Sequence, residues 1–291
     1  LPQLVPQSVI NRLDDDQQIA VRVSVIDNIQ SKHRSNKTKD QLSQPTLCFD
    51  FEGTSEVSLG NRNTPPSITS SAILYVLRLW LGDAVPLNEG VMRAVMIKLP
   101  SNSLLSPLPN SAVVAGNVET SQALVDTLLV ALQLQAHGQG TMNNLTLGWK
   151  TGSYYETLCG GTGAGQNYHG CNAIHCHMTN SRLTDPEVFE RNVPMLINHF
   201  FIRTESGGEG LWRGGNGVNR LLTAQETISI SILSSRRVTR AQGLAGGQSG
   251  VSGQNLLKRK YDNEWTILDG NISLTLQAGD QLCILTLGGG G

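Results

Sequence analysis

The stretch YYETLCGGTGAGQNYHGCNAIHCHMTNSR (residues 154–182) gathers the most chemically versatile side chains of this sequence into one segment. It contains three of the five cysteines, three of the six histidines and five glycines that precede Cys171. Four kinds of feature are compatible with such a segment: a phosphate-binding loop, a metal site, a cysteine nucleophile, or a tight corner of the backbone. The patterns within the segment and on either side of it separate these possibilities.

The glycine run GGTGAG (residues 160–165) matches no nucleotide-binding loop well, because QN stands where a P-loop needs lysine and then serine or threonine. Two interpretations remain. The glycines either adopt positive φ or pack closely against another segment, or their successive amides form a nest for an anion or a developing oxyanion. In the second interpretation Glu156 would position a water molecule or a polar edge of a ligand.

His175 and His177 are spaced for one face of a strand, so that both imidazoles could reach one ion. No third ligand is evident, and we therefore expect no metal and favour histidines that hydrogen-bond within a polar layer. Cys159 precedes the glycines, whose amides could lower the pKa of the thiol, and a downstream histidine could take its proton. The alternative is that Cys159 is buried and inert.

Upstream of this segment, stretches with an apolar residue at every second position take turns with stretches whose apolar residues recur at helical spacing. They predict strands at residues 19–26, 46–53 and 93–100, and helices at residues 69–82 and 118–140. The polar residues 30–45 are expected to form an exposed loop. Just after the segment, Asp185 and Pro186 predict the start of a short helix.

From about residue 200 onward, short β-like runs are separated by glycine turns, which predicts a layer of antiparallel strands. The fold class is therefore α+β, with helices and sheet mixed in the first half and a β-rich C-terminal portion. We expect an N-terminal segment with a strand and an exposed loop, an α+β domain that carries the glycine-rich corner, and a β-rich domain (residues 1–45, 46–199 and 200–291).

Charge and cysteine content restrict the class of protein. Lysine and arginine number 22 against 23 aspartates and glutamates, a net charge of −1, which gives no reason to expect nucleic acid or an anionic membrane as a partner. Only 15% of residues are charged, against about 25% in typical domains, so we expect a covering partner and an oligomer. No apolar run reaches the ~20 residues of a membrane span. The odd, scattered cysteines favour a reducing, cytoplasmic location.

Several motifs together resemble the hydantoinase B/5-oxoprolinase family, and its 5-oxoprolinase branch in particular. They are FDFEGTS (49–55), GNVETSQALVDTLL (116–129), GQGTMNN (138–144), HCHMTNSRLTDPEVFE (175–190) and SGGEGLWRGGNGVNR (206–220). The resemblance runs from about residue 46 to residue 291, whereas residues 1–45 match poorly. It is a resemblance to the C-terminal part of the B-type half of the family, so the sequence is expected to be a fragment or a split subunit.

The resemblance implies an ATP-dependent hydrolysis of a cyclic amide, 5-oxo-L-proline to L-glutamate, as in glutathione metabolism. ATP would be split to ADP and phosphate, because phosphorylation of the amide oxygen creates a better leaving group. ATP and Mg would be bound mainly by an A-type ATP-binding half, without which this chain is expected to be inactive. A divalent metal is expected, if anywhere, in the N-terminal part of the B-type half. Water then needs a base and the oxyanion needs donors.

We expect the catalytic residues to be Glu156, Cys159, His175 and His177. The expected substrate-binding residues are Gly160, Gly161, Gly163, Gly165, Thr179, Asn180 and Arg182. Structural roles are expected for two other groups: turns for Gly207, Gly208, Gly214 and Gly215, and bonds to carboxylates or carbonyls for Arg236 and Arg237. Three alternatives stay open: a non-catalytic subunit that scaffolds the assembly, hydantoinase-type activity on another cyclic amide, and stand-alone cysteine hydrolysis through Cys159.

Overall fold

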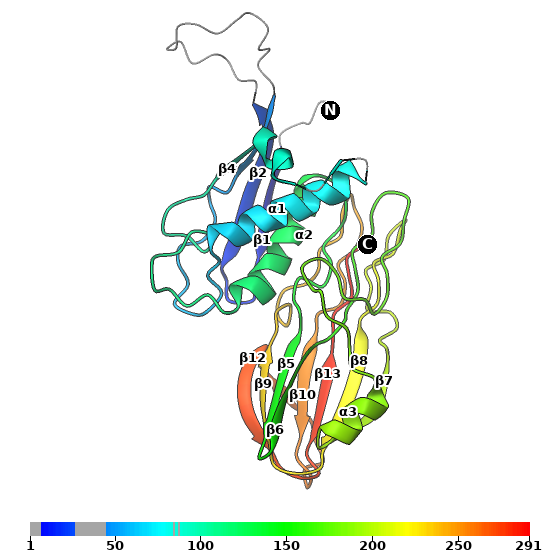
Figure 1. The fold of residues 1–291 in the computed structure, drawn as a ribbon. Coiled ribbons are helices and arrows are strands. Elements are labelled where there is room, and N and C mark those ends of the chain that lie inside the picture. Colours follow the sequence, from blue (N-terminus) through cyan, green and yellow to red (C-terminus); the bar gives the residue numbers. More distant parts are fainter. Residues whose placement is uncertain (1–6, 27–44, 84, 87) are drawn as a thin grey trace, which may run out of the picture.

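A computed structural model of the chain describes residues 7–26, 45–83, 85–86 and 88–291. The described residues form two parts that lie one above the other in Figure 1. Two helices cover a sheet in the first part, and two sheets dominate the second. The α+β class with a β-rich C-terminal portion is therefore confirmed. The predicted exposed loop at residues 30–45 lies, apart from Pro45, outside the described residues.

The first part is a four-stranded sheet in the order β1 (Gln7–Arg12), β2 (Gln18–Ile26), β3 (Thr46–Asp50) and β4 (Val95–Lys98). The first two pairs of strands are antiparallel, whereas β3 and β4 are parallel. The helices α1 (Pro66–Leu81) and α2 (Ser121–Ala131) pack on one face of this sheet (Figure 1). Apolar side chains of β2, β3 and both helices form one buried cluster, so burial of apolar surface holds this part together.

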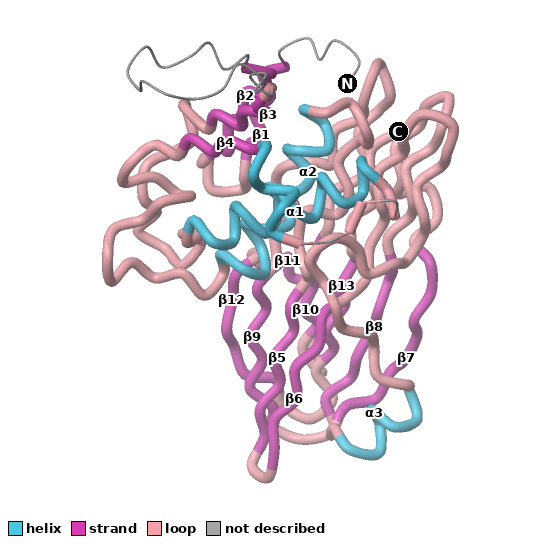
Figure 2. Tube along the Cα trace, turned by 45° about the horizontal axis from the view of Figure 1, so that its top comes forward, coloured by secondary structure: helices cyan, strands magenta, loops and turns pink. Residues whose placement is uncertain are grey.

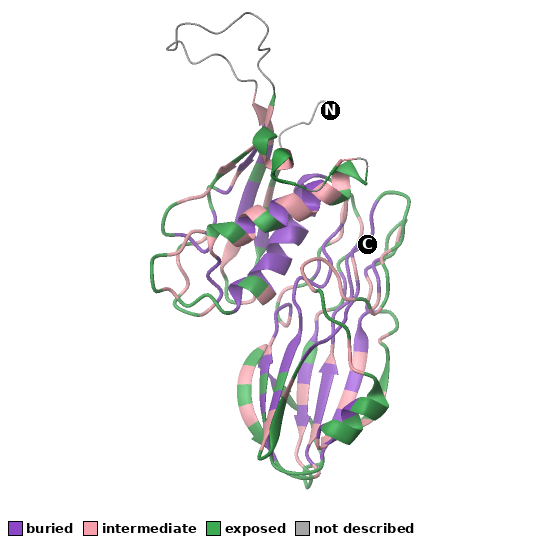
Figure 3. Cartoon of the chain, in the orientation of Figure 1, coloured by how far each residue is buried: buried purple, intermediate pink, exposed green. Residues whose placement is uncertain are grey.

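Helix α2 is shorter than predicted but more deeply buried. It begins after a π-helical turn at Gly116–Thr120 and ends at Ala131, so the prediction of a helix up to residue 140 was wrong. Gln133 has a φ of 57°, a left-handed conformation that does not continue an α-helix. Every residue of α2 except Val130 is buried, and most of this helix is purple in Figure 3. Its polar side chains must therefore find partners inside the protein.

The second part consists of two antiparallel sheets that face each other. One is ordered β12 (Asn271–Leu276), β9 (Ile228–Leu233), β5 (Asn144–Trp149), β6 (Gly152–Thr157). The other is ordered β11 (Thr266–Leu268), β10 (Gln254–Lys258), β13 (Gln281–Leu285), β8 (Val218–Ala224), β7 (Met195–Ile202). Leucines and isoleucines from both sheets share one buried cluster, which explains the alternating burial along β8 and β9.

The predicted domain boundaries can be compared with these elements. β1 and β2 lie within residues 1–45 but share a sheet with β3, and the boundary at residues 199/200 lies within β7. The division into three domains stays a prediction. The predicted helix start at Asp185 is confirmed, because its side chain accepts hydrogen bonds from the amides of Glu187 and Val188 at the start of α3 (Pro186–Asn192).

Glycine-rich loops run side by side beyond the ends of the strands (Figure 2). They are joined by backbone hydrogen bonds, such as Gly161 N to Leu287 O at 3.1 Å and Gly289 N to Gly215 O at 2.9 Å. A Cβ atom on Gly161 would lie 1.9 Å from the carbonyl oxygen of Gly215. These glycines have no positive φ, so close packing of backbones requires them. Gly207, Gly208, Gly214 and Gly215 have the same role, and the turn role expected for them was wrong.

This packing predicts that Gly161→Ala destabilises the fold by about 3 kcal/mol or more, because the methyl group would collide with rigid backbone rather than with a movable side chain. The matched control is Gly148→Ala in β5, where an added Cβ would meet nothing within 4 Å. That control is expected to be neutral or stabilising by up to about 1 kcal/mol. Urea unfolding followed by circular dichroism measures both changes, and equal effects would contradict the packing role.

Candidate functional site

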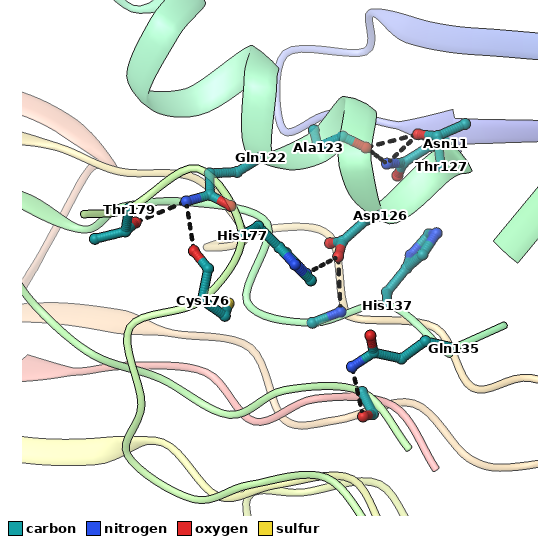
Figure 4. Close-up of polar contacts among 12 residues, drawn as sticks. Asn11, Gln122, Ala123, Asp126, Thr127, Gln135, His137, Cys176, His177 and Thr179 are labelled. Carbon is teal, nitrogen blue, oxygen red and sulfur yellow. Dashed lines mark hydrogen bonds and ion pairs between the residues drawn. The ribbon is translucent and has the colours of Figure 1, made fainter. Parts of the chain in front are cut away.

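A buried polar cluster lies where α2 meets the loops of the second part (Figure 4). Asp126 of α2 is at its centre and is fully buried. The Oδ1 atom of Asp126 accepts a hydrogen bond from Gly138 N at 2.9 Å and lies 3.3 Å from Nε2 of His177. The Oδ2 atom lies 3.6 Å from Nη2 of Arg236. Three separate segments thus converge on one carboxylate.

The charges of this cluster follow from its surroundings. Burial raises the pKa of Asp126, but the close contact with His177 Nε2 and the nearby charges of His137, His177 and Arg236 outweigh it, so the pKa is lowered. Burial and the charge of Arg236 lower the pKa of His137 to about 4. At neutral pH the cluster therefore contains a charged Asp126–Arg236 pair beside a neutral His137 imidazole.

The same cluster ties the first strand to the second part. Asn11 of β1 donates from Nδ2 to the Ala123 carbonyl at 3.0 Å and accepts from Arg236 Nη2 at 3.1 Å. Asp14, just after β1, accepts from the Arg237 amide at 2.7 Å. The expectation that the paired arginines bond carboxylates or carbonyls is confirmed by the Arg236–Asp126 pair and by Arg237 Nη1 with Ser235 O.

Glu156 lies in a second buried ion pair. Its Oε1 atom is 2.6 Å from Arg220 Nη1, and its Oε2 atom accepts from the Tyr154 hydroxyl at 3.0 Å. The rings of Phe189 and Phe200 lie over the Arg220 guanidinium, at 5.0 and 5.6 Å. Both carboxylate oxygens are engaged, so Glu156 could position water only if this pairing opened.

A pocket of about 260 Å³ brings Cys159 and His175 together beside the end of β7, where Phe200, Phe201 and Ile202 line it. Burial raises the pKa of Cys159 to about 11, so the thiol keeps its proton at neutral pH. Of the two alternatives for Cys159, the buried thiol is the one found, because burial outweighs the hydrogen bond of the Cys159 amide and the charge of Arg220, which lower the pKa. His175 Nε2 lies 3.0 Å from the Thr157 carbonyl oxygen.

The strand-face arrangement that would let His175 and His177 reach one ion is not found. His175 and His177 lie in a loop, and they reach the Thr157 carbonyl and Asp126 respectively. Among the described residues, no group of three or more His, Cys, Asp or Glu side chains is arranged to hold a metal ion. Thr179 Oγ1 accepts from Gln122 Nε2 at 2.7 Å, whereas Asn180 and Arg182 are exposed.

Five of the six amides of residues 160–165 donate to carbonyl oxygens. Gly160, Gly161 and Gly165 donate to Ile174, Leu287 and Tyr168. A Cβ atom on Gly163 would lie 2.0 Å from the Ala136 carbonyl oxygen, so this glycine also allows close backbone approach. Of the two interpretations of the glycine run, close packing is the one found, and the predicted nest for an anion is not formed in this conformation.

Asp126, His137 and Tyr75 were not predicted from the sequence as residues of the site. A signal was present for Asp126, because it is the one charged residue in the apolar run LVDTLLV (residues 124–130). A charge on the buried side of a helix must be paired. His137 and Tyr75 gave no comparable signal, since their partners come from distant segments.

Comparison with known proteins gives a consistent result. The family model described as Hydantoinase B/oxoprolinase matches residues 7–291. Over 84% of its length the chain is 47% identical to 5-oxoprolinase 1 from Arabidopsis thaliana and 44% identical to 5-oxoprolinase from Saccharomyces cerevisiae. It spans only 19% and 20% of the length of those relatives.

Two solved structures share the fold. The ATP-dependent caprolactamase from Pseudomonas jessenii superposes with a TM-score of 0.78 at 18% identity, over 98% of this chain and 51% of the other. The nucleotide-free structure of acetone carboxylase gives 0.77 at 16% identity, over 94% and 41%. No helix within the described ranges has the length and apolar character that crossing a bilayer requires.

The Glu156–Arg220 pair predicts a large cost for removing one partner. Arg220→Met should destabilise the fold by about 3–5 kcal/mol, because it leaves a buried carboxylate without its counter-charge. Arg213→Met is the matched control, since the Arg213–Glu209 pair is exposed and should lose less than about 1 kcal/mol. The double variant Glu156→Leu/Arg220→Met should regain much of the loss. Denaturant unfolding of the three variants tests this, and a small effect of Arg220→Met would contradict it.

The lowered pKa of His137 predicts that the fold loses part of its stability in acid. Its pKa is about 4 in the fold and 6.5 in the unfolded chain, so the unfolded state binds the extra proton as the pH falls from 6.5 towards 4. Wild type should therefore lose stability relative to His137→Gln by up to about 1.4 kcal/mol per pH unit in this window. Glu119, whose pKa burial raises to about 7, acts in the opposite direction, and the comparison cancels it. Parallel pH profiles of the two proteins would refute the assignment.

Proposed function

The chain belongs to the hydantoinase B/oxoprolinase family, and we propose that it is part of an enzyme that couples ATP hydrolysis to the opening of a cyclic amide. The reaction we infer is 5-oxo-L-proline, ATP and water to L-glutamate, ADP and phosphate. The observation that supports this substrate most directly is the 47% identity to 5-oxoprolinase 1 over 84% of the chain. Hydantoinase-type activity on another cyclic amide is the closest alternative.

The glycine run does not fit a phosphate cradle, because five of the six amides of residues 160–165 donate to backbone carbonyls and leave no row of free donors. We therefore assign ATP and Mg to an A-type half, which would correspond to part of the length by which the relatives exceed this chain. In this proposal the chain is inactive without that half. It has to supply a base for the attacking water and polar contacts for the substrate.

His177 is the best-placed base among the four predicted catalytic residues. Glu156 is held by Arg220, and Cys159 keeps its proton. His175 faces a backbone carbonyl, whereas His177 is oriented by a buried carboxylate. We propose that His177 exchanges the proton of the reaction, and that the exposed Asn180 and Arg182 in the same loop contact the substrate.

A non-catalytic scaffold is the second candidate function. It is supported by the internal engagement of Glu156 and of the glycine amides, because groups that hold the fold together are not free for a ligand. Stand-alone cysteine hydrolysis is disfavoured by the raised pKa of Cys159. The oligomeric state, the cytoplasmic location and the role in glutathione metabolism stay predictions.

Lactam-dependent ATP hydrolysis by the assembled enzyme, which contains this chain and its ATP-binding half, tests the proposal. His177→Gln is expected to lower kcat/KM about 10²–10⁴-fold, because it removes acid–base catalysis. The control is His199→Gln on the edge strand β7, which should retain wild-type activity.

Other outcomes identify the alternatives. Equal rates with and without this chain would sink the proposal. Full turnover of His177→Gln, combined with loss of assembly when the chain is removed, would favour the scaffold. Loss of an ATP-independent hydrolysis on Cys159→Ser would favour a cysteine nucleophile.

A further inference from the structure

Three side chains from three separate segments stand in a row at the junction of the two parts. The Tyr75 hydroxyl of α1 lies 3.4 Å from His177 Nδ1, and His177 Nε2 lies 3.3 Å from Asp126 Oδ1. The tyrosine and imidazole rings meet edge to face, with centroids 5.9 Å apart and an interplanar angle of 75°. The two ring nitrogens of His177 therefore serve different partners, a hydroxyl and a carboxylate.

An ionised Asp126 favours one direction of hydrogen bonding along this row. Its lowered pKa keeps the carboxylate ionised, so it can only accept, and a neutral His177 with its proton on Nε2 directs that proton at Oδ1, 3.3 Å away. Nδ1 then presents its lone pair to the Tyr75 hydroxyl. Burial raises the pKa of Tyr75 to about 12, with a further contribution from Cys176, so the hydroxyl keeps its proton. The resting row runs from Tyr75 to His177 to Asp126.

The surroundings hold this row in place. Gln122 donates from Nε2 to Cys176 O and to Thr179 Oγ1, on either side of His177, and so ties the loop to α2. His177 itself has a φ of 55°, a left-handed conformation that is unfavourable for a non-glycine residue. Gly140, with a φ of 58°, leaves room for the carboxylate, because a Cβ atom there would lie 2.8 Å from Asp126 Oδ2.

Two buried atoms of the row lack a hydrogen bond, and one of its three side chains is partly exposed. Asp126 Oδ2 and His177 Nε2 are buried without a hydrogen bond of full geometry, although His177 and Arg236 lie close to the carboxylate. Such loose contacts in a ligand-free catalytic site tighten when the substrate complex forms. The side chains of His177 and Asp126 are 4% and 0% exposed, whereas Tyr75 is only half-buried. Of these three side chains, Tyr75 is therefore the most exposed.

We propose that Tyr75, His177 and Asp126 form a proton relay for the opening of the cyclic amide, with Tyr75 as the residue that contacts the reacting water. The relay rests on the function proposed above. As the water oxygen bonds to the amide carbon, its proton passes to the Tyr75 oxygen while the Tyr75 proton moves to His177 Nδ1. Asp126, which Arg236 helps to keep ionised, stabilises the resulting imidazolium. When the carbon–nitrogen bond breaks, the path runs in reverse and delivers the proton to the ring nitrogen.

The attacking water supplies the oxygen that bonds to the amide carbon and the proton that reaches the ring nitrogen, and the relay returns to its starting state. The phosphoryl group that ATP places on the amide oxygen leaves as phosphate when a second water hydrolyses the resulting acyl phosphate, so each turnover consumes one ATP and two waters. Tyr75 is the catalytic residue of the three in the strict sense, and Asp126 is a positioning residue that acts through His177. A purely structural row would contribute to folding stability but would not influence the pH dependence of turnover. The test must therefore measure both.

The first experiment uses the assembled enzyme and lactam-dependent ATP hydrolysis. Tyr75→Phe removes only the hydroxyl and is expected to lower kcat/KM about 10²-fold or more, with little change in Tm. Tyr168→Phe is the matched control, because Tyr168 is also partly exposed and donates to a backbone carbonyl, that of Leu134. Asp126→Asn should shift the acidic limb of the pH profile of kcat/KM. A rate for Tyr75→Phe within about twofold of Tyr168→Phe would overturn the relay.

The second experiment does not depend on activity. Nitrogen NMR of the His177 imidazole in the same assembly should report a proton on Nε2 in wild type, a changed tautomer balance in Asp126→Asn, and a perturbed Nδ1 signal in Tyr75→Phe. If wild type showed no lactam-dependent ATP hydrolysis, the proposed function would be contradicted. The NMR measurement would still show whether Tyr75, His177 and Asp126 are linked by hydrogen bonds. An imidazole insensitive to both substitutions would overturn the proposal.

Discussion

The buried carboxylate of Asp126 is the constraint around which the two parts of the molecule are arranged. A charge that is fully removed from water costs several kcal/mol unless it is paired and hydrogen-bonded. Its partners are the Gly138 amide, His177 and Arg236, and none of them belongs to α2. The loop after α2, the His177 loop and the loop after β9 must therefore converge on this helix.

The glycine-rich loops make that convergence possible. Ordinary side chains would keep neighbouring loops apart, whereas a Cβ atom on Gly163 would lie only 2.0 Å from the Ala136 carbonyl oxygen. Backbone hydrogen bonds such as Ala136 N to Ala164 O and Gly290 N to His137 O then hold the residues that precede Gly138. A glycine-rich layer thus positions a site made of side chains. Most amides of its glycine run donate to backbone carbonyls, which is why this run offers no cradle for a phosphate.

The sequence predicted those features that depend on local pattern. Alternating apolar residues located β2 and β3, and Asp185 with Pro186 located the start of α3, because caps and periods are properties of neighbouring residues. His175 and His177 do not lie on one face, because residues two apart share a face only within a strand and these two lie in a loop. The choice between positive φ and close packing for Gly161 depended on Gly215, far along the chain. Long-range partners of this kind leave no local signal.

The two buried carboxylates of the site differ in a way that bears on function. Glu156 is 2.6 Å from a guanidinium that is itself enclosed by two aromatic rings, and its second oxygen holds a tyrosine. Such an arrangement is closed, because both oxygens of the Glu156 carboxylate are already engaged by Arg220 and Tyr154. Asp126 instead meets an imidazole whose other nitrogen faces the half-buried Tyr75. A carboxylate stabilises a proton on a histidine most strongly inside the protein, and it affects chemistry only where that histidine is linked to the surface. Of the two, only Asp126 meets both conditions.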